Sequence, residues 1–423
     1  MADSNKHTPS LRFPEFNSAP GWIILPIGEV ADTFSGGTPY VGNSDFYGGT
    51  IPFIRSGEIA CEKTAISLTE YGLSNSAAKM IKKGTLLYAL YGATSGNVAI
   101  SKIDGAINQA ILAIIPKDDK YNNYFVYYFL EYQKPSVLSK YLQGGQGNLS
   151  AAIINSIPIA IPCNCDGTIS CDEQAKVVDI LLSLDSLIAA TKSKLEQLKE
   201  HKRGLIQRLF PARGKTVPEL RFPEFLNDGE WEMATMESIF EIKNGYTPSK
   251  SNPDYWEGGT IPWFRMEDIR KSGHILSDSI QHITPSAVKS AGLFPAYSII
   301  VATTATIGEH ALIIVDSLAN QRFTFLTKRK SFDNRIDMVY FHYFMFIIDE
   351  WCKQNTNAGG LLSVNMEAFR KLVIPYPASL SEQHKIAECF SSIDKQIAAT
   401  KRKFEQLKEH QKGLMQRLFP IVK

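Results

Sequence analysis

The sequence predicts a mixed α/β fold of two globular units, each followed by one long helix. The first observation is a repeat: residues 188–211 recur as residues 397–420, with 19 of 24 positions identical at an offset of 209. The second is that the repeat includes the globular units, since LRFPEF at 11–16 recurs at 220–225. The third is a series of short apolar runs of strand length in each unit. The chain order is therefore unit, helix, unit, helix.

Short apolar runs bounded by Gly, Asp and Lys predict four strands in each unit. They lie at 50–55, 85–91, 98–103 and 110–116, and again at 260–265, 298–302, 311–315 and 323–328. An aromatic helical segment follows in both units, at 121–132 and 337–351. Its aromatic side chains could stack on bases, but their helical spacing favours a core helix packed on the sheet.

The repeated helices carry apolar residues in a 4,3,4,3 spacing over more than four heptads, which favours a coiled coil between them over two separate amphipathic helices, each on its own domain. Each should be ~55 Å long, and equal units with equal helices favour an antiparallel pair with pseudo-two-fold symmetry. Gly204 and Gly413 are expected to allow close backbone approach near the ends of the coil, and the alternative is a helix that loosens before QRLFP. The predicted coiled-coil interface residues are Leu181, Leu184, Ile188, Thr191, Leu195, Leu198, Leu205, Phe390, Ile393, Ile397, Thr400, Phe404, Leu407 and Leu414.

The composition is that of an ordinary globular protein, and 423 residues suffice for more than one core. The net charge of +2 leaves room for a local basic face. The sequence shows neither an apolar signal segment nor a run of about 18 apolar residues, so we expect a cytoplasmic protein that does not span a membrane. Cys163, Cys165 and Cys171 lack the spacing of a zinc site, which favours reduced thiols in a loop over metal ligands.

Two fragments resemble catalytic motifs but fail on spacing. Residues 214–216 (Gly-Lys-Thr) resemble the end of a phosphate-binding loop, but Leu209 stands where the first glycine belongs. Residues 252–255 (Asn-Pro-Asp-Tyr) resemble an amino-methyltransferase motif, but Asp254 replaces its second proline and no glycine-rich cofactor loop precedes it. The sequence therefore predicts a noncatalytic chain without a cofactor.

The remaining candidates for function are polar, glycine-rich loops that differ between the units while the strands agree. Residues 91–97 correspond to 303–309, and residues 143–148 correspond to 355–360. Amide, hydroxyl and guanidinium groups can read base edges where glycines permit close approach, although an ordinary turn is the alternative for each loop. Loop chemistry alone selects these candidate DNA contacts: Arg55, Tyr91, Thr94, Ser95, Asn97, Gln109, Gln143, Gln146, Asn148, Arg265, Thr303, Thr304, Thr306, Gln321, Arg322 and Asn357.

These motifs together resemble the specificity subunit of type I restriction-modification enzymes. The resemblance rests on the paired LRFPEF segments, GGTIP followed by a strand and Arg, the GAT-x-G and Asn-Gln segments, and two QRLFP helix ends. It implies two target recognition domains, each reading one half of a bipartite, asymmetric site in double-stranded DNA. It also implies that the helices set the spacer and dock two DNA-methyltransferase subunits, with ATP-dependent translocating restriction subunits completing the complex.

The resemblance implies four segments: recognition domain 1 at 1–172, spacer helix 1 at 173–210, recognition domain 2 at 211–381 and spacer helix 2 at 382–423. Two alternatives remain. The chain could be a coiled-coil scaffold whose two globular units bind protein, or it could serve a methylation-only or phage-defence system that has no nuclease. The sequence leaves open which bases are read.

Overall fold

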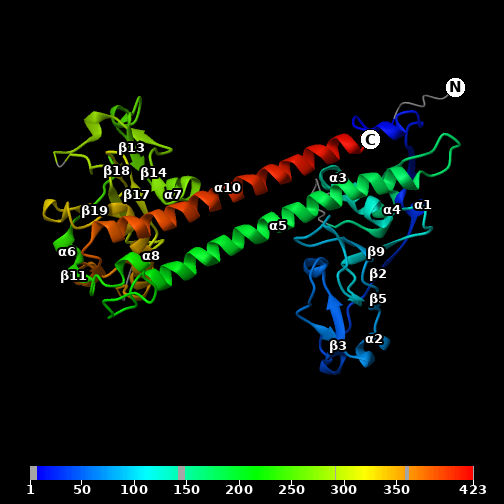
Figure 1. Cartoon of the computed structure of the whole chain (residues 1–423). Helices are drawn as coiled ribbons and strands as arrows, with labels where there is room; N and C mark the ends of the chain where they lie inside the picture. Colours follow the sequence, from blue (N-terminus) through cyan, green and yellow to red (C-terminus); the bar gives the residue numbers. More distant parts are fainter. Residues whose placement is uncertain (1–6, 142–147, 291, 358–361, 423) are drawn as a thin grey trace. The chain divides into compact units, whose positions relative to one another are not determined.

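The computed structural model of the protein describes residues 7–141, 148–290, 292–357 and 362–422. Contacts divide the chain into unit 1 (residues 1–192 and 402–423) and unit 2 (residues 193–401). Both boundaries fall inside the long helices α5 (Cys171–Leu209) and α10 (Leu380–Leu418), drawn in green and in orange to red in Figure 1. Each unit therefore combines a globular part with segments of both helices, and the predicted domain boundaries stay a prediction.

Unit 1 contains two four-stranded sheets, β2-β9-β6-β7 and β4-β3-β8-β5, and the two-stranded sheet β1-β10. Strand pairs are antiparallel except β3 with β8. The elements are β1 (Ile23–Pro26), α1 (Ile27–Val30), β2 (Ala31–Ser35), β3 (Tyr47–Ile54), β4 (Ser67–Leu68), α2 (Glu70–Ser74), β5 (Lys79–Ile81), β6 (Leu86–Ala89), β7 (Val98–Ile100), β8 (Gly105–Ile107), β9 (Ile111–Pro116), α3 (Asn123–Tyr141), α4 (Ala151–Ser156) and β10 (Pro158–Ile161).

Unit 2 repeats this arrangement with a five-stranded sheet, β12-β19-β16-β17-β14, a three-stranded sheet, β15-β13-β18, and the two-stranded sheet β11-β20. Two strand pairs are parallel in unit 2: β13 with β18, and β14 with β17. The elements are β11 (Glu232–Thr235), α6 (Met236–Ile239), β12 (Phe240–Asn244), β13 (Ile261–Phe264), α7 (Met266–Ser272), β14 (Ile275–Leu276), β15 (His282–Ile283), β16 (Ser298–Ala302), β17 (His310–Ile313), β18 (Leu318–Ala319), β19 (Phe323–Lys328), α8 (Met338–Gln354), α9 (Met366–Lys371) and β20 (Val373–Tyr376).

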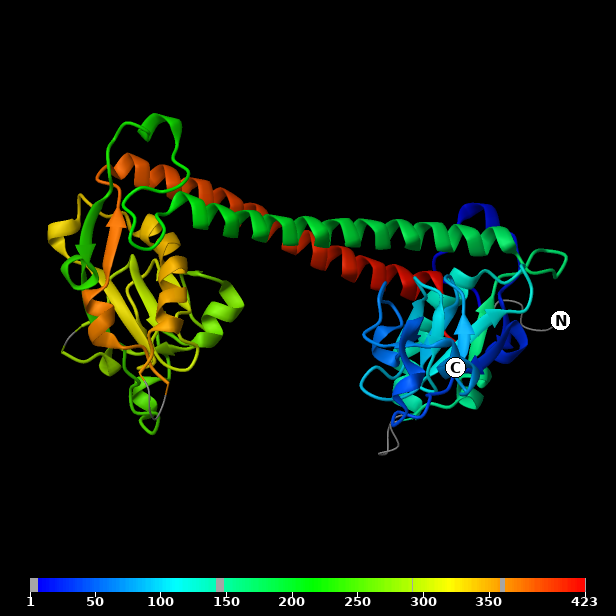
Figure 2. The same cartoon turned by 90° about the horizontal axis from the view of Figure 1, so that it is seen from below.

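All eight predicted strands are present, as β3, β6, β7 and β9 in unit 1 and β13, β16, β17 and β19 in unit 2. The sequence did not predict the two-stranded sheets. One pairs Ile23 with Ile161 and the other pairs Glu232 with Tyr376. Figure 2 shows β20 in orange beside β11 in green. Such partners lie far apart in the sequence, so a local pattern of apolar residues does not indicate the pairing.

The aromatic helices α3 and α8 are core helices, as predicted. In unit 1, Phe125 and Phe129 are fully buried, and their rings meet Phe419 at the end of α10 with centroids 5.5 and 5.4 Å apart. In unit 2, Phe344 of α8 meets Phe210 at the end of α5, with centroids 5.4 Å apart. The phenylalanine of each QRLFP segment therefore lies in an aromatic core, where edge-to-face contacts add to the stabilisation from buried apolar area.

Each LRFPEF segment is hydrogen-bonded to the last turn of a long helix. Leu220 N donates to Arg208 O at the end of α5 in unit 2, and Leu11 N donates to Arg417 O at the end of α10 in unit 1, both at 2.9 Å. The carbonyls at a helix C-terminus lack partners within the helix, so these bonds satisfy one of them at each end. In unit 1 the bond joins the two ends of the chain.

Within each unit the two long helices run antiparallel. In unit 2, Lys202 Nζ lies 2.6 Å from Asp394 Oδ1, and the Phe210 ring stacks on Phe390 with centroids 5.8 Å apart. From the first contact to the second, the residue number rises along α5 and falls along α10, as it must between antiparallel helices. In unit 1, Gln411 Nε2 donates to Asp185 Oδ1 at 2.7 Å, and Leu418 packs in one core with Leu181 and Val177.

The predicted apolar stripe is turned away from solvent along both helices. Its 14 residues are buried or half-buried, while Lys192, Lys199, Lys401 and Lys408 are exposed. The expectation for Gly204 and Gly413 is wrong, because a Cβ atom at either position would meet nothing within 4 Å. Among the described residues no helix is long and apolar enough to cross a membrane.

Candidate functional site

The two Asn-Gln segments lie directly after the short strands β8, in the sheet β4-β3-β8-β5, and β18, in the sheet β15-β13-β18. Asn108 N donates to Ile54 O at 3.2 Å, and Asn320 N donates to Phe264 O at 3.1 Å. These bonds place Arg55 and Arg265, which follow Ile54 and Phe264, beside the Asn-Gln segments. The parallel pairing of β3 with β8 and of β13 with β18 explains the arrangement, because parallel strands end at the same edge of a sheet.

A threonine from a separate loop completes each cluster. The hydroxyl of Thr38 donates to Gln109 Oε1, and the hydroxyl of Thr247 donates to Gln321 Oε1. Glycine permits the close approach of these loops: a Cβ at Gly36 would lie 1.8 Å from the carbonyl oxygen of Ile107. The sequence analysis missed both threonines, although the repeated Thr-Pro pair at 38–39 and 247–248 was a signal that could have identified them.

The glycine-rich loop of unit 1 is fixed by hydrogen bonds at both ends. Gly96 N donates to Ala89 O at 2.8 Å, and Ser95 Oγ donates to Leu90 O at 3.0 Å. Tyr91 forms an antiparallel bridge with Asn148, the one residue of the second predicted loop that the structure describes. Lys134 of α3 donates to Asn97 Oδ1 at 2.6 Å, so this amide is held by the core helix.

The corresponding loop of unit 2 is also held by a β-bridge and by a backbone bond from its glycine, since Gly308 N donates to Ala302 O at 2.9 Å. Thr304 forms an antiparallel bridge with Ser363, and Asn357 N donates to Ser363 O at 2.9 Å. Gly308 has φ +89° and approaches α8 so closely that a Cβ there would lie 1.8 Å from Asp349 Oδ1. Glycine is therefore required at this position both for the backbone conformation and for space.

The two arginines differ in their neighbours. Arg55 Nε lies 3.0 Å from Glu58 Oε2, and 45% of its side chain is exposed. Burial raises the pKa of Glu58, but hydrogen bonds from Arg55 and from Ala65 N outweigh burial and lower it. The Arg265 guanidinium lies over the Trp263 ring at 5.9 Å, and its buried Nε has no hydrogen-bond partner in the structure as described. Arg265 is therefore the less fully satisfied of the two guanidinium groups.

The predicted DNA contacts fall into three groups by exposure. The buried group has one member, Thr303, which is 7% exposed and whose hydroxyl lies 3.2 Å from that of Thr324. Gln143 and Gln146 lie outside the described residues. Exposed residues are Arg55, Gln109, Asn148, Gln321, Arg322 and Asn357, and half-buried residues are Tyr91, Thr94, Ser95, Asn97, Arg265, Thr304 and Thr306. The structure places Arg55 beside the Asn-Gln segment of unit 1 and Arg265 beside that of unit 2, and the contact of the predicted residues with DNA stays a prediction.

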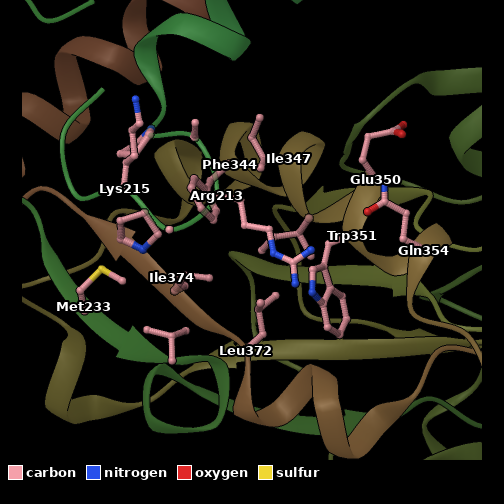
Figure 3. A pocket seen from close by; sticks show the side chains of 16 residues that line it. Arg213, Lys215, Met233, Phe344, Ile347, Glu350, Trp351, Gln354, Leu372 and Ile374 are labelled. Atoms are coloured by element: carbon pink, nitrogen blue, oxygen red, sulfur yellow. The ribbon is translucent and has the colours of Figure 1, made fainter. Parts of the chain in front are cut away.

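An apolar pocket of about 480 Å³ lies elsewhere in unit 2. Figure 3 shows it between α8, the β11-β20 sheet and the loop after α5, with Trp351, Phe344, Leu372 and Met233 among its lining side chains. None of the predicted DNA contacts lines this pocket. In the described parts of the chain, no group of three or more His, Cys, Asp or Glu residues is arranged to hold a metal ion.

Comparison with known proteins finds the same duplication. The family model of the type I restriction modification DNA specificity domain matches residues 20–200 and again residues 228–409. The EcoprrI specificity subunit of Escherichia coli is 44% identical over 188 residues, which is 44% of this chain and 47% of that protein. The MjaIX specificity subunit of Methanocaldococcus jannaschii is 25% identical over 63% of this chain and 62% of that protein.

These matches span about half to three-fifths of the relatives' lengths. A solved S subunit of a type-I restriction-modification system from M. genitalium shares the fold with a TM-score of 0.59 at 16% identity. That match covers 98% of this chain and 100% of the other. Because the family model covers most of the sequence in two copies, the chain belongs to the family of type I restriction modification DNA specificity proteins.

Proposed function

We propose that the chain is the DNA-specificity subunit of a type I restriction-modification complex, in which each unit reads one half of a bipartite, asymmetric site in double-stranded DNA. The repeated cluster carries this proposal: each unit gathers a threonine, an Asn-Gln pair and an arginine at the same strand ends. The backbone frame agrees between the units and the surrounding side chains differ. Two versions of one reading surface suit two different half-sites.

The exposed groups of the clusters match the hydrogen-bonding edges of base pairs in the major groove. Arg55 of the first cluster, and the exposed Arg322 next to Gln321 in the second, can donate to guanine O6 and N7. The amides of Gln109 and Gln321 can bind adenine N6 and N7. The threonine hydroxyl orients each Gln amide by donating to its Oε1. This leaves the NH₂ group and one lone pair of Oε1 for a base.

We assign the two long helices a double role in this proposal: they set the distance between the half-sites and dock two DNA-methyltransferase subunits. Exposed lysines occur at positions related by the repeat offset of 209: Lys192 corresponds to Lys401, and Lys199 corresponds to Lys408. Equivalent surfaces in two copies suit two copies of one partner. In this proposal the chain itself is noncatalytic. ATP-dependent restriction subunits complete the complex, which acts on DNA in the cytoplasm.

Long-read mapping of methylated adenines in cells with and without the chain tests this function. We expect a bipartite, asymmetric motif that is methylated when the chain is present and unmethylated when it is absent. Replacing residues 20–160 with another recognition domain should change one half of the motif and preserve the other. Identical methylation maps with and without the chain would contradict the proposal.

A second measurement separates DNA recognition from the protein-scaffold alternative. In an electrophoretic mobility assay with the methyltransferase partner, the complex should retain DNA carrying the mapped motif and release DNA in which one half-site is scrambled. Equal retention of both DNAs would favour a scaffold whose units bind protein.

A further inference from the structure

The loops that carry Thr38 and Thr247 have the same backbone frame. In unit 1, Asn43 N donates to Tyr40 O at 3.1 Å, and in unit 2, Asn252 N donates to Ser249 O at 3.3 Å. Both asparagine side chains then accept a bond from the backbone two residues later, at 3.1 Å, and start a short 3-10 turn. The two loops are therefore one structure used twice, and residues at equal places in them can be compared directly.

An aromatic side chain after each turn secures the loop to its unit. Tyr47 OH donates to Pro39 O at 2.7 Å in unit 1, and Trp256 Nε1 donates to Ser249 O at 2.9 Å in unit 2. Pro39 and Pro248 are buried in both loops. The base of each loop is thus held by buried proline, by an aromatic donor and by the threonine–glutamine contact, and the two residues after the proline project from a fixed frame.

Those two residues differ in chemistry between the units. Unit 1 presents Tyr40 and Val41, whose exposed fractions of 75% and 77% mark them as a freely accessible apolar pair. Unit 2 presents Ser249 and Lys250 at the same places, both exposed. The Lys250 ammonium forms no ion pair or hydrogen bond with the described part of the protein. The exposed apolar pair of unit 1 and the exposed polar pair of unit 2 are both free to contact a ligand bound at the neighbouring cluster.

We propose that these turn tips, residues 40–41 and 249–250, are specificity-determining elements that touch base edges beside the Asn-Gln clusters. The inference rests on the proposed function, because it takes the partner to be DNA. Each tip adjoins Gln109 or Gln321 through its threonine, so a duplex bound at the cluster reaches the tip as well. The exposed Lys250 ammonium carries a positive charge without an ion-pair partner in the described part of the protein, which suits a polyanion and favours DNA at this surface.

The side chains assign a base chemistry to each tip. Tyr40 and Val41 offer apolar surface and suit the 5-methyl group of thymine, the apolar feature of the major groove. Lys250 offers an ammonium donor and suits the O6 and N7 acceptors of guanine, with the Ser249 hydroxyl beside it. Unit 1 is therefore assigned a half-site with an A·T pair under the tip, and unit 2 a half-site with a G·C pair.

Exchanging the tips tests the assignment within the full chain and its complex. One variant combines Tyr40→Ser with Val41→Lys, and its reciprocal combines Ser249→Tyr with Lys250→Val. Each is produced with the methyltransferase subunits of its host, and methylated adenines are mapped. Tyr124→Ser serves as the matched control, because Tyr124 is also an exposed aromatic residue of unit 1 and lies at the start of α3, outside the cluster.

In the first variant, discrimination at one A·T pair should fall about fourfold in the half-site read by unit 1, since burial of one methyl group contributes about 0.8 kcal/mol and about 1.4 kcal/mol is tenfold. The half-site read by unit 2 should stay unchanged and shows that the complex is assembled. The reciprocal variant should relax one G·C pair in the other half-site. Tyr124→Ser should leave both halves unchanged. If a double variant unfolds, Val41→Thr and Lys250→Met carry the test with smaller changes.

Two results would overturn the assignment. The first is an unaltered motif in both exchange variants while the wild-type chain still directs a bipartite motif, in which case the inference fails and the proposed function stands. The second is an unaltered motif with weakened assembly of the complex, which would make the tips a protein contact. A wild-type chain without any dependent motif would instead refute the proposed function itself.

Discussion

Arg12 and Glu173 form a buried, bidentate ion pair between the LRFPEF segment and the first turn of α5, 161 residues later. Arg12 Nε and Nη2 each donate to a Glu173 carboxylate oxygen at 2.7 Å, and Trp22 Nε1 donates to the same carboxylate at 3.0 Å. The side chains of Arg12 and Glu173 are 5% and 1% exposed. Unit 2 repeats the pair with Arg221 and Glu382. Each globular part is thus fastened to the start of the helix that follows it.

Breaking this pair from one side should strongly destabilise unit 1. Glu173→Ala leaves the Arg12 guanidinium buried without its partner, so we expect the free energy of unfolding to fall by about 3–5 kcal/mol. Urea unfolding measures the change. Lys176 with Glu15 provides the control, because both side chains of that ion pair are about half exposed and Glu15→Ala should leave the unfolding midpoint nearly unchanged. Equal losses in both variants would contradict the importance of burial.

Replacing the two helix glycines should stabilise the protein. Gly204 and Gly413 lie inside α5 and α10, and a Cβ at either position meets nothing within 4 Å. Alanine there should raise the free energy of unfolding by about 1 kcal/mol per site, since glycine costs a helix interior that much. Gly308→Ala is the opposite control and should destabilise unit 2, because the new Cβ would clash with Asp349. In thermal unfolding, the midpoint temperature should rise in the two helix variants and fall in Gly308→Ala.

Unit 2 should lose stability in mild acid. Burial, with a smaller effect of nearby His274, lowers the pKa of His310 to about 3, and burial also lowers the pKa of His342. Below pH 6.5 these histidines bind protons in the unfolded chain but not in the folded protein. Each should therefore lower the free energy of unfolding by about 1.4 kcal/mol for every pH unit below 6.5.

The variant that combines His310→Val with His342→Tyr checks this pH dependence. It introduces the residues that unit 1 carries at the corresponding places, Val98 and Tyr127. Urea midpoints at pH 7 and pH 5 should differ by less in this variant than in the wild type, provided that both remain folded at pH 7. An equal pH dependence would assign the acid sensitivity to groups other than these two histidines.

Shortening both helices should change the length of the DNA spacer and leave the half-sites intact. Removing seven residues from each apolar stripe preserves its phase, because the stripe repeats every heptad, and shortens each helix by ~10 Å. Methylation mapping should then find the same two half-sites at a new separation. Altered half-sites at the original separation would refute the role of the helices as a spacer. A full-length chain with one conservative Lys199→Arg change serves as the control for helix substitution.

Local patterns in the sequence sufficed for the repeated order of units and helices, all eight predicted strands, the core position of the aromatic helices and the apolar stripe. These features depend on periodicity and composition within short windows, which a single chain displays directly. Gln109 and Gln321 were selected from loop chemistry alone, because their amides can bind base edges.

Contacts between distant residues were settled by the tertiary structure alone. The bond between Leu11 and Arg417, the ion pair of Arg12 with Glu173, and the contact of Thr38 with Gln109 join segments whose proximity no local pattern records. The open space around Gly204 likewise depends on what packs nearby and not on the helix itself. Sequence determined the elements and their repetition, because each depends on its neighbours in the chain. Folding determined which loops meet, because that depends on how the strands pair across each unit.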